Sequence, residues 1–470
     1  MNKIIKLTVL LVITICCWLP VFADVMTIGE VIEIALEQNL QVQSGKSKEK
    51  YQSYISKSVR GKYLPTFKVS ASALLWNDEN KTKMDLPVLD AVIQEVLPTL
   101  SPESRQRIQN AADESDSSGI AIHDKHSYKV SATVIQPVLS LYGIYNMHNA
   151  SLKMEKAAEY DTVKTKRELQ KDIAKVYFGM LSAIENEKSL DAAIEQTDKR
   201  YPIISALIDE GRIEPNALLK LKLQRSDFEK GKIAASIAIE NSKLVLNMIM
   251  NRNLDTPFEP VWNDEYYKTV EEKVMGNEDA QNTVAFLKNI PEIKGMEERL
   301  SASKSNKHAA ISSFLPELNL VLNYDFQEGF GDMQPQNQFY AGMLFSWNIW
   351  EWGNGFYKIK AAETQTTETQ LNLALLKSGK TLEIKKMHNS LKKSLAEIKN
   401  GEIHVKYAKE NLRIEDELFK AGNSTTMELI QTQTSLVKAE NDLNIRKAEL
   451  CSLYIEFILL TGRDFKEFDV

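Results

Sequence analysis

The sequence predicts a mainly helical protein with a small β part, built from a duplicated helix–strand–strand–long helix–helix unit. The first observation is at 419–462, where Gly422 and Asn423 break a helix and apolar residues then recur at every seventh position. The recurring residues are Leu429, Leu436, Leu443, Leu450 and Phe457. This period is typical of a helix that lies along other helices. The second observation is that a similar turn occurs 211 positions earlier, where Gly211 corresponds to Gly422.

Two further matches, in the same order along the chain, support a duplication. The segment GKYLPTFKVSASALLW around Pro65 resembles SSFLPELNLVLNYDF around Pro316. The segments SATVIQPVLSLYG and GMLFSWNIWEWG also correspond, and they end at Gly143 and Gly353. We therefore interpret residues 24–260 and 261–470 as two copies of one unit.

Residues 1–23 have the parts of a secretory signal peptide. Lys3 and Lys6 form the basic region, an apolar stretch follows, and Val21-Phe22-Ala23 is a small-x-small cleavage site. We expect cleavage between Ala23 and Asp24 rather than a membrane anchor, because the apolar run is short. After cleavage Cys451 is the one remaining cysteine, so no internal disulfide is expected and its thiol is interpreted as a packed side chain.

Composition and motifs argue against an enzyme and against a nucleic-acid partner. The formal charge is −6, and an acidic surface is a poor footprint for nucleic acid. The chain contains no phosphate-binding glycine loop, zinc-ligand spacing or nucleophile elbow. His123 and His126 lie in a polar stretch that we interpret as a solvated loop rather than a metal site. We expect no catalytic residue, no metal and no cofactor.

Long helices should account for most of the chain. Thr27 caps the first, with Glu30 at capping-box spacing, and Leu64-Pro65 ends it. A helix from about Gly143 to Leu207 and another over 355–419 would each extend about 100 Å at ~1.5 Å per residue. Helices of this length must lie against comparable partners.

Four short segments alternate between apolar and polar residues, at about 66–76, 128–138, 317–326 and 338–348. Loops 77–127 and 327–337 join them in two pairs. This alternation and length are typical of transmembrane β-barrel strands. Four strands are too few to close a barrel, so several protomers would have to share one; the alternative is a soluble β domain with helical arms.

With these elements in order, the chain resembles the TolC-like outer-membrane efflux protein family. The resemblance extends over nearly all of the sequence after residue 23. Its motifs are Thr27-x-x-Glu30-x-x-x-x-Ala35-Leu36-x-x-Asn39, Gln136-Pro137, Asn289-Ile-Pro-Glu-Ile293, Leu315-Pro316, Ala421-Gly422-x-Ser424-x-x-x-Glu428-Leu429-Ile430 and Leu460-Thr461-Gly462.

The resemblance implies a homotrimer in which a trimeric α-barrel joins a shared 12-stranded transmembrane β-barrel. Such a protein sits in the bacterial outer membrane, contacts its lipid and extends into the periplasm. It is the exit duct of a tripartite efflux pump or type I secretion system, and it docks on a periplasmic adaptor protein and an inner-membrane transporter. The alternative is a periplasmic adaptor or a coiled-coil structural protein of an envelope complex, which would have one helical hairpin and larger β domains.

The resemblance also implies the positions of a tip and a gate. The turns at Gly211 and Gly422 would form the periplasmic tip, and the residues implied to bind partners there are Gly211, Arg212, Glu214, Gly422, Asn423 and Thr425. The implied pore and gate residues are Glu428, Gln431, Phe419 and Ser424. Family members carry two acidic rings, and here Glu428 keeps the first whereas Gln431 replaces the second. Glu428 can alternatively serve only to stabilise the helix N-terminus.

The chain departs from the family's pattern at the lock that holds the gate closed. Ala217 stands where an acid locks the first turn, and Phe419 and Ser424 stand where a Tyr and an Arg hold the second. Closure would then depend on Arg212 and Glu214, or on the packing of Phe419.

Overall fold

The computed structural model describes residues 24–78, 80–82, 87–117, 120–261, 264–275, 283–331 and 336–463. The expected signal peptide, including Ala23, lies outside the described residues. The protein is mainly helical, as the sequence predicts. Its contacts divide it into two compact units, one comprising Met1–Gln52, Met154–Leu300 and Glu368–Val470 and the other Ser53–Lys153 and Ser301–Thr367. Each unit draws on both halves of the sequence.

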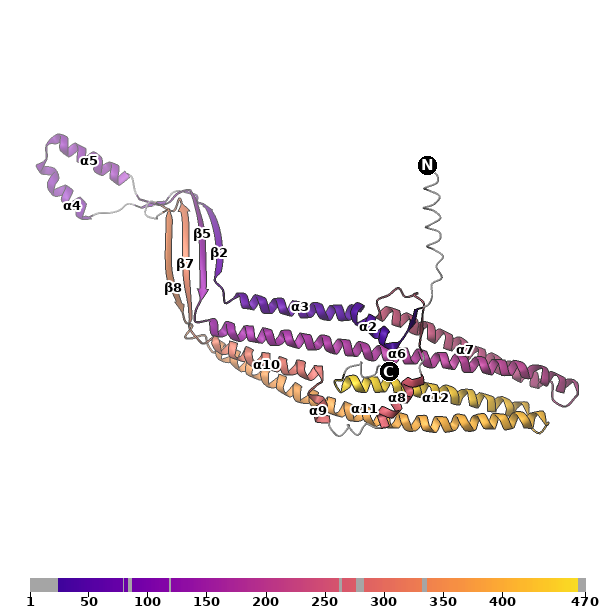
Figure 1. Ribbon diagram of the computed structural model, residues 1–470. Coiled ribbons are helices and arrows are strands. Elements are labelled where there is room, and N and C mark those ends of the chain that lie inside the picture. The colour runs from indigo at the N-terminus through magenta and orange to yellow at the C-terminus, as the bar shows by residue number, and fades with distance from the viewer. Residues whose placement is uncertain are drawn as a thin grey trace, which may run out of the picture. The chain divides into compact units, whose positions relative to one another are not determined.

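The first unit is built from helices and one two-stranded sheet. Figure 1 shows α7 alongside the later part of α6, and α12 alongside the later part of α11. Elements within this unit are β1 (Asp24–Met26), α2 (Ile28–Gln38), α7 (Asn216–Ile249), β6 (Phe258–Pro260), α8 (Asp264–Met275), α9 (Thr283–Leu287) and α12 (Thr426–Leu460). Four helices run through both units: α3 (Leu40–Gly61), α6 (Leu141–Asp209), α10 (Pro291–Ser312) and α11 (Asn354–Lys420).

The main apolar core of this unit surrounds the parallel pair β1–β6. Tyr177 of α6 is completely buried there, and its hydroxyl donates to the carbonyl O of Met26 at 2.9 Å. The same hydroxyl accepts from the amide N of Val261 at 3.0 Å, so one side chain holds both strand ends on α6. Cys451 is buried in this core, in agreement with the packed side chain expected from sequence.

The first helix differs from the sequence-based expectation, which ran unbroken to Tyr63. The Thr27–Glu30 capping box is present, but the helix is interrupted at Asn39, where the backbone is extended (ψ 132°). The Asn39 side chain stabilises the break, because its Oδ1 accepts from the amide of Gln41 at 2.8 Å and its Nδ2 donates to Ile249 O at 2.8 Å. An Asn that caps one helix while anchoring another favours two helices over one.

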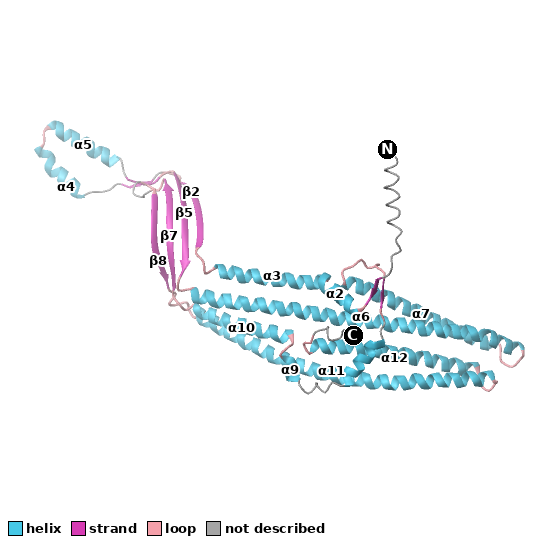
Figure 2. Ribbon diagram, viewed as in Figure 1, coloured by secondary structure: helices cyan, strands magenta, loops and turns pink. Residues whose placement is uncertain are grey.

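The second unit contains an antiparallel sheet of four strands in the order β2–β5–β7–β8 (Figure 2). The strands are β2 (Thr66–Leu75), β5 (His126–Pro137), β7 (Glu317–Glu328) and β8 (Asn337–Ser346), each within two residues of the expected bounds. Between β2 and β5 lie β3 (Asn80–Thr82), α4 (Pro87–Val96), the 3-10 helix η1 (Leu97–Thr99), α5 (Pro102–Ser117) and β4 (Ile120–His123).

The sheet has one apolar and one polar face. Val69, Ala132, Tyr324 and Phe339 lie opposite one another across the four strands, and Val69 is 76% exposed. The next row carries the polar residues Lys68, Thr133, Asn323 and Tyr340, in which Thr133 Oγ1 donates to Asn323 Oδ1 at 2.6 Å. A further polar link on this face is the ion pair of Lys129 with Asp325 at 3.0 Å. Across the described residues, none of the helices is at once long enough and apolar enough to span a membrane.

Candidate functional site at the helix turns

Both long hairpins of the first unit turn through the same backbone motif. After α6, Gly211 N bonds Ile208 O at 2.8 Å and Arg212 N bonds Leu207 O at 2.9 Å. After α11, Gly422 N bonds Phe419 O at 3.0 Å and Asn423 N bonds Leu418 O at 2.9 Å. This is the Schellman arrangement, which places a residue with positive φ after the helix, and here φ is 75° at Gly211 and 78° at Gly422. Glycine is required at both positions because other residues are strained there.

An apolar cluster lies behind the two turns. We call it the tip cluster, and its buried members are Ile204, Ala217, Leu221, Leu412, Phe419, Leu429 and Leu436. Phe419 is 4% exposed, so its side chain packs between helices of one protomer rather than facing solvent. Ala217 is likewise buried, so it contributes to the packing of the cluster. The sequence-based alternative in which Phe419 contributes by packing fits this position.

Glu428 belongs to the cap of α12. Its Oε2 accepts from Thr425 N at 2.8 Å and from Thr425 Oγ1 at 2.9 Å, while Glu428 N donates to Thr425 Oγ1 at 3.2 Å. These bonds form a capping box in which Thr425 is the N-cap. The hydrogen bond from the backbone of Thr425 lowers the pKa of Glu428, with further help from the hydroxyls of Thr425 and Ser424. The helix-end role considered as the alternative is therefore present.

The other implied site residues lie at the surface of the turns or bond within them. Ser424 donates to Glu415 and, at 3.2 Å, to Glu428 Oε2. Arg212 pairs with Glu210 at 3.8 Å, and its guanidinium also lies against the second turn, because a Cβ built on Gly422 would be 3.3 Å from Arg212 Nη2. All implied site residues except Phe419 and Ser424 are exposed: Gly211, Arg212, Glu214, Gly422, Asn423, Thr425, Glu428 and Gln431.

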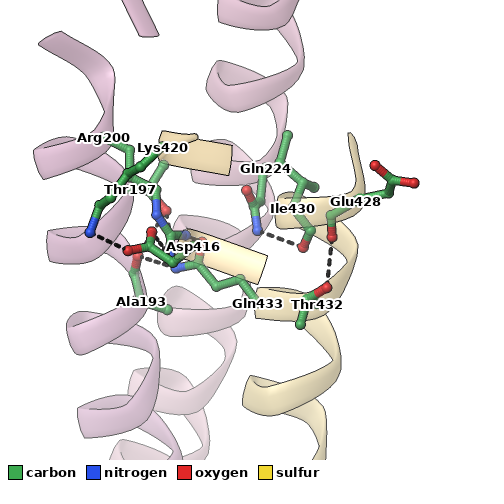
Figure 3. Close-up of polar contacts among 10 residues, drawn as sticks. All are labelled: Ala193, Thr197, Arg200, Gln224, Asp416, Lys420, Glu428, Ile430, Thr432 and Gln433. Carbon is green, nitrogen blue, oxygen red and sulfur yellow. Dashed lines mark hydrogen bonds and ion pairs between the residues drawn. The ribbon is translucent and has the colours of Figure 1, made fainter. Parts of the chain in front are cut away.

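A polar network that sequence reasoning missed connects the two hairpins beside the tip cluster (Figure 3). Arg200 of α6 donates to Gln433 Oε1 of α12 and to Asp416 Oδ1 of α11, the latter at 3.3 Å. Lys420 contacts the other Asp416 oxygen at 2.6 Å. Burial lowers the pKa of Arg200, and the carboxylate of Asp416 opposes that effect.

Two glutamine side chains extend this network to backbone carbonyls. Gln433 Nε2 donates to Ala193 O at 3.0 Å, and Gln224 Nε2 of α7 donates to Ile430 O at 3.2 Å. Figure 3 shows Glu428 directed away from these contacts. Charged and amide residues beside an apolar heptad seam are the sequence signal for such links, but the same pattern occurs on any solvated helix face.

One segment of the sequence matches a known protein family. Residues 284–462 match the family model of outer membrane efflux proteins. The resemblance to that family inferred from sequence is thereby confirmed, and its members are channels and not enzymes. An outer-membrane location agrees with this family. A comparison with curated protein sequences gave no match.

Solved outer-membrane channels have the same fold. The Campylobacter jejuni CmeC outer membrane channel is 17% identical, with a TM-score of 0.72 over 93% of this chain and 85% of that one. The outer membrane protein VceC of Vibrio cholerae is 15% identical, with a TM-score of 0.72 over 93% of this chain and 96% of that one. The Neisseria gonorrhoeae MtrE outer membrane channel, solved in its open state, is 15% identical, with a TM-score of 0.68 over 93% of this chain and 89% of that one.

Proposed function

We propose that the protein is the outer-membrane exit duct of a tripartite efflux pump or type I secretion system. It assembles as a homotrimer, each protomer giving four strands to a 12-stranded barrel and its long helices to a periplasmic α-barrel. Substrates enter at the periplasmic tip and leave outside the cell. The observation that carries this proposal is the four-stranded sheet, which exposes a whole apolar face and has two edges available for pairing.

The sheet edges support a barrel shared between protomers. Among the described strands, β2 pairs only with β5 and β8 only with β7. An unpaired strand edge in lipid leaves backbone groups without hydrogen bonds, because no water is present there. Pairing β8 of one protomer with β2 of the next would supply hydrogen bonds to the backbone groups of both edges. Three protomers would then close a 12-stranded barrel, and this even number of strands lies within the range known for bacterial outer-membrane barrels.

Exposed apolar residues on the helices support the same assembly. On α7 they include Leu219, Leu223, Ile233 and Ile237, each between 51% and 67% exposed. On α11 they include Ile403, Tyr407, Ile414 and Leu418, between 40% and 67% exposed. Stripes with spacings of four and seven residues are typical of helices that pack on neighbours, and apolar patches of this kind mark interfaces. We assign them to contacts between protomers.

The alternative of a periplasmic adaptor or structural coiled-coil protein is less well supported. It gives no role to the apolar sheet face, where Phe67, Val69, Leu75, Phe339 and Met343 are each at least 68% exposed. In a membrane barrel this face would contact the lipid chains, which explains why it is apolar and exposed. The test is single-channel recording: the purified oligomer in a planar bilayer should conduct ions, whereas a water-soluble protein without conductance would contradict the duct.

The proposed topology follows from the order of elements. Export by the signal peptide of residues 1–23 delivers the chain to the periplasm, and loops 77–127 and 327–337 lie outside the cell. The turns at Gly211 and Gly422 form the periplasmic tip, where the adaptor and the inner-membrane transporter dock. Protease added to intact cells should cleave within 77–127; cleavage near Gly211 or Gly422 instead would invert this topology.

We further propose that Glu428 forms a carboxylate ring at the tip. Its side chain is exposed, and its lowered pKa keeps it ionised at neutral pH. Three carboxylates around a narrow axis attract cations, while Gln431 adds no second charge. Glu428→Gln should reduce cation preference in single-channel recordings. The matched control is Thr425→Ala, which removes the cap hydroxyl but keeps the carboxylate and should keep the preference. Unchanged selectivity in Glu428→Gln would remove Glu428 from the pore.

A further inference from the structure

The loop between β2 and β5 carries a helical insert that its counterpart lacks. The connection from β2 to β5 runs over residues 76–125, whereas the connection from β7 to β8 runs over 329–336 and has far fewer residues. A connection between two antiparallel strands therefore needs only a short loop in this protein. The additional residues form α4, η1 and α5, which we call the insert (Pro87–Ser117).

The turn of the insert is fixed by specific hydrogen bonds. Arg105 of α5 reaches back to η1 and its flanks, donating through Nε to Leu97 O at 3.0 Å and through Nη2 to Pro98 O at 3.1 Å and Leu100 O at 3.3 Å. Thr99 Oγ1 donates to Val96 O at 2.6 Å, which caps the end of α4. Three carbonyls satisfied by one guanidinium make a defined turn rather than an irregular loop.

The insert nevertheless has no core of its own among the residues whose side chains are described. None of residues 91–111 is buried. Val92 and Val96 of α4 are 51% and 44% exposed, and Ile93 of α4 and Leu97 at the start of η1 are half-buried. A helix of 10 residues is marginal in water without a packing partner, so an amphipathic helix of this length requires one.

We propose that the apolar face of α4 packs against the inserts of neighbouring copies of this chain. This inference rests on the proposed trimer, which brings three inserts to the same side of the membrane. Charge supports a second copy over a phosphate-bearing lipid surface, because the insert carries Asp90, Glu95, Glu103, Asp113, Glu114 and Asp116 against Arg105 and Arg107. The signs are also separated: α4 has acids and no base, whereas the basic residues are in the first half of α5. Copies can therefore place Arg107 of one insert near acids of the next.

Cysteine crosslinking in the protein without residues 1–23, which hold Cys16 and Cys17, tests this contact. The native thiol does not interfere, because burial raises the pKa of Cys451 to about 12 and leaves it 1% exposed. With a short bis-maleimide, Val92→Cys should give covalent dimers and trimers. Gln94→Cys, an exposed residue of the same helix outside the apolar face, is the matched control and should give at least severalfold less. Adding Arg107→Glu should lower the yield from Val92→Cys severalfold.

Two crosslinking experiments together test the insert contact and the trimer independently of each other. Amine crosslinking of the wild-type protein should give three-chain species. If it does, and Val92→Cys gives no more intermolecular product than Gln94→Cys, the insert contact is wrong while the trimer stands. If wild-type protein gives no three-chain species, the proposed assembly and this inference both fail.

Discussion

Arg200 of α6 and Asp416 of α11 form an ion pair that joins the two helical hairpins of one protomer, with 3.3 Å between Nη2 and Oδ1. The Arg200 side chain is 12% exposed, and it also donates to Gln433 of α12. The hairpins are therefore held together near their turns by a specific polar link in addition to the tip cluster. A partly buried pair with further hydrogen bonds is a place where removing one partner is costly.

Replacing Arg200 should destabilise this part of the molecule. Arg200→Met removes hydrogen bonds to a carboxylate and an amide and should cost about 1.5–3 kcal/mol of stability, measured by thermal or denaturant unfolding. The control is Arg413→Met, because Arg413 pairs with Glu410 and Glu417 on one exposed helix face and such pairs contribute little. If the two variants lost equal stability, the ion pair between the hairpins would stabilise the protein no more than an exposed ion pair on one helix.

Two glycine substitutions in α11 and its turn should have opposite signs. Gly422→Ala forces a residue with a Cβ to adopt φ near 78° and should cost about 1–2 kcal/mol. Gly379→Ala, inside the helix with nothing within 4 Å of the added Cβ, should instead stabilise by about 0.5–1 kcal/mol. Differential scanning calorimetry of both variants checks the pair. A destabilised Gly379→Ala would mean that another protomer occupies the space around this face.

The cap of α12 should make stability depend on pH through Glu428. Its folded pKa lies below the ordinary 4.5, so the stabilisation from its charge is present above about pH 4.5 and is lost as the pH falls through the lowered value. Glu428→Gln should therefore melt below the wild type at pH 7, and the difference should vanish in acid. Thr425→Ala should cost about 1 kcal/mol at pH 7. Part of that cost should also fall in acid, because the Thr425 hydroxyl donates to the ionised Glu428 carboxylate and helps to lower its pKa. A pH-independent difference for Glu428→Gln would show that its charge is not stabilising.

The two faces of β2 should respond differently to the same charge. Val69 lies on the apolar face and is 76% exposed, and its neighbour Ser70 lies on the polar face. Val69→Arg should cost about 2–4 kcal/mol in the membrane and reduce the amount of protein in the outer-membrane fraction. Ser70→Arg should leave that amount nearly unchanged. A reversed order would place lipid on the other face.

The strands and long helices could be predicted because their patterns are local. Alternation fixed which residues share a face of β2, as the neighbouring rows of Val69 and Lys68 show. The interruption of the first helix could not be predicted, because it depends on a bond from Asn39 to Ile249, 210 positions away. A lone Asn within a helical pattern does not reveal such a distant partner.

The positions of the two turns could be predicted from sequence, but the capping residue and the polar link beside them could not. Gly211 and Gly422 identify the helix ends, since positive φ selects glycine. The choice of Thr425 as the cap depends on which residue is extended before α12 (ψ 152°). The Arg200 link was missed because pairing across two hairpins depends on how they are packed, and helix periodicity does not specify that packing.

Native mass spectrometry of the detergent-extracted protein can show whether protomers of this chain share one membrane barrel. The measurement counts chains without assuming a substrate or a pump partner. We expect a particle of three chains, because the four strands of each protomer leave two edges that only neighbouring protomers can pair. A folded particle of a single chain would contradict it.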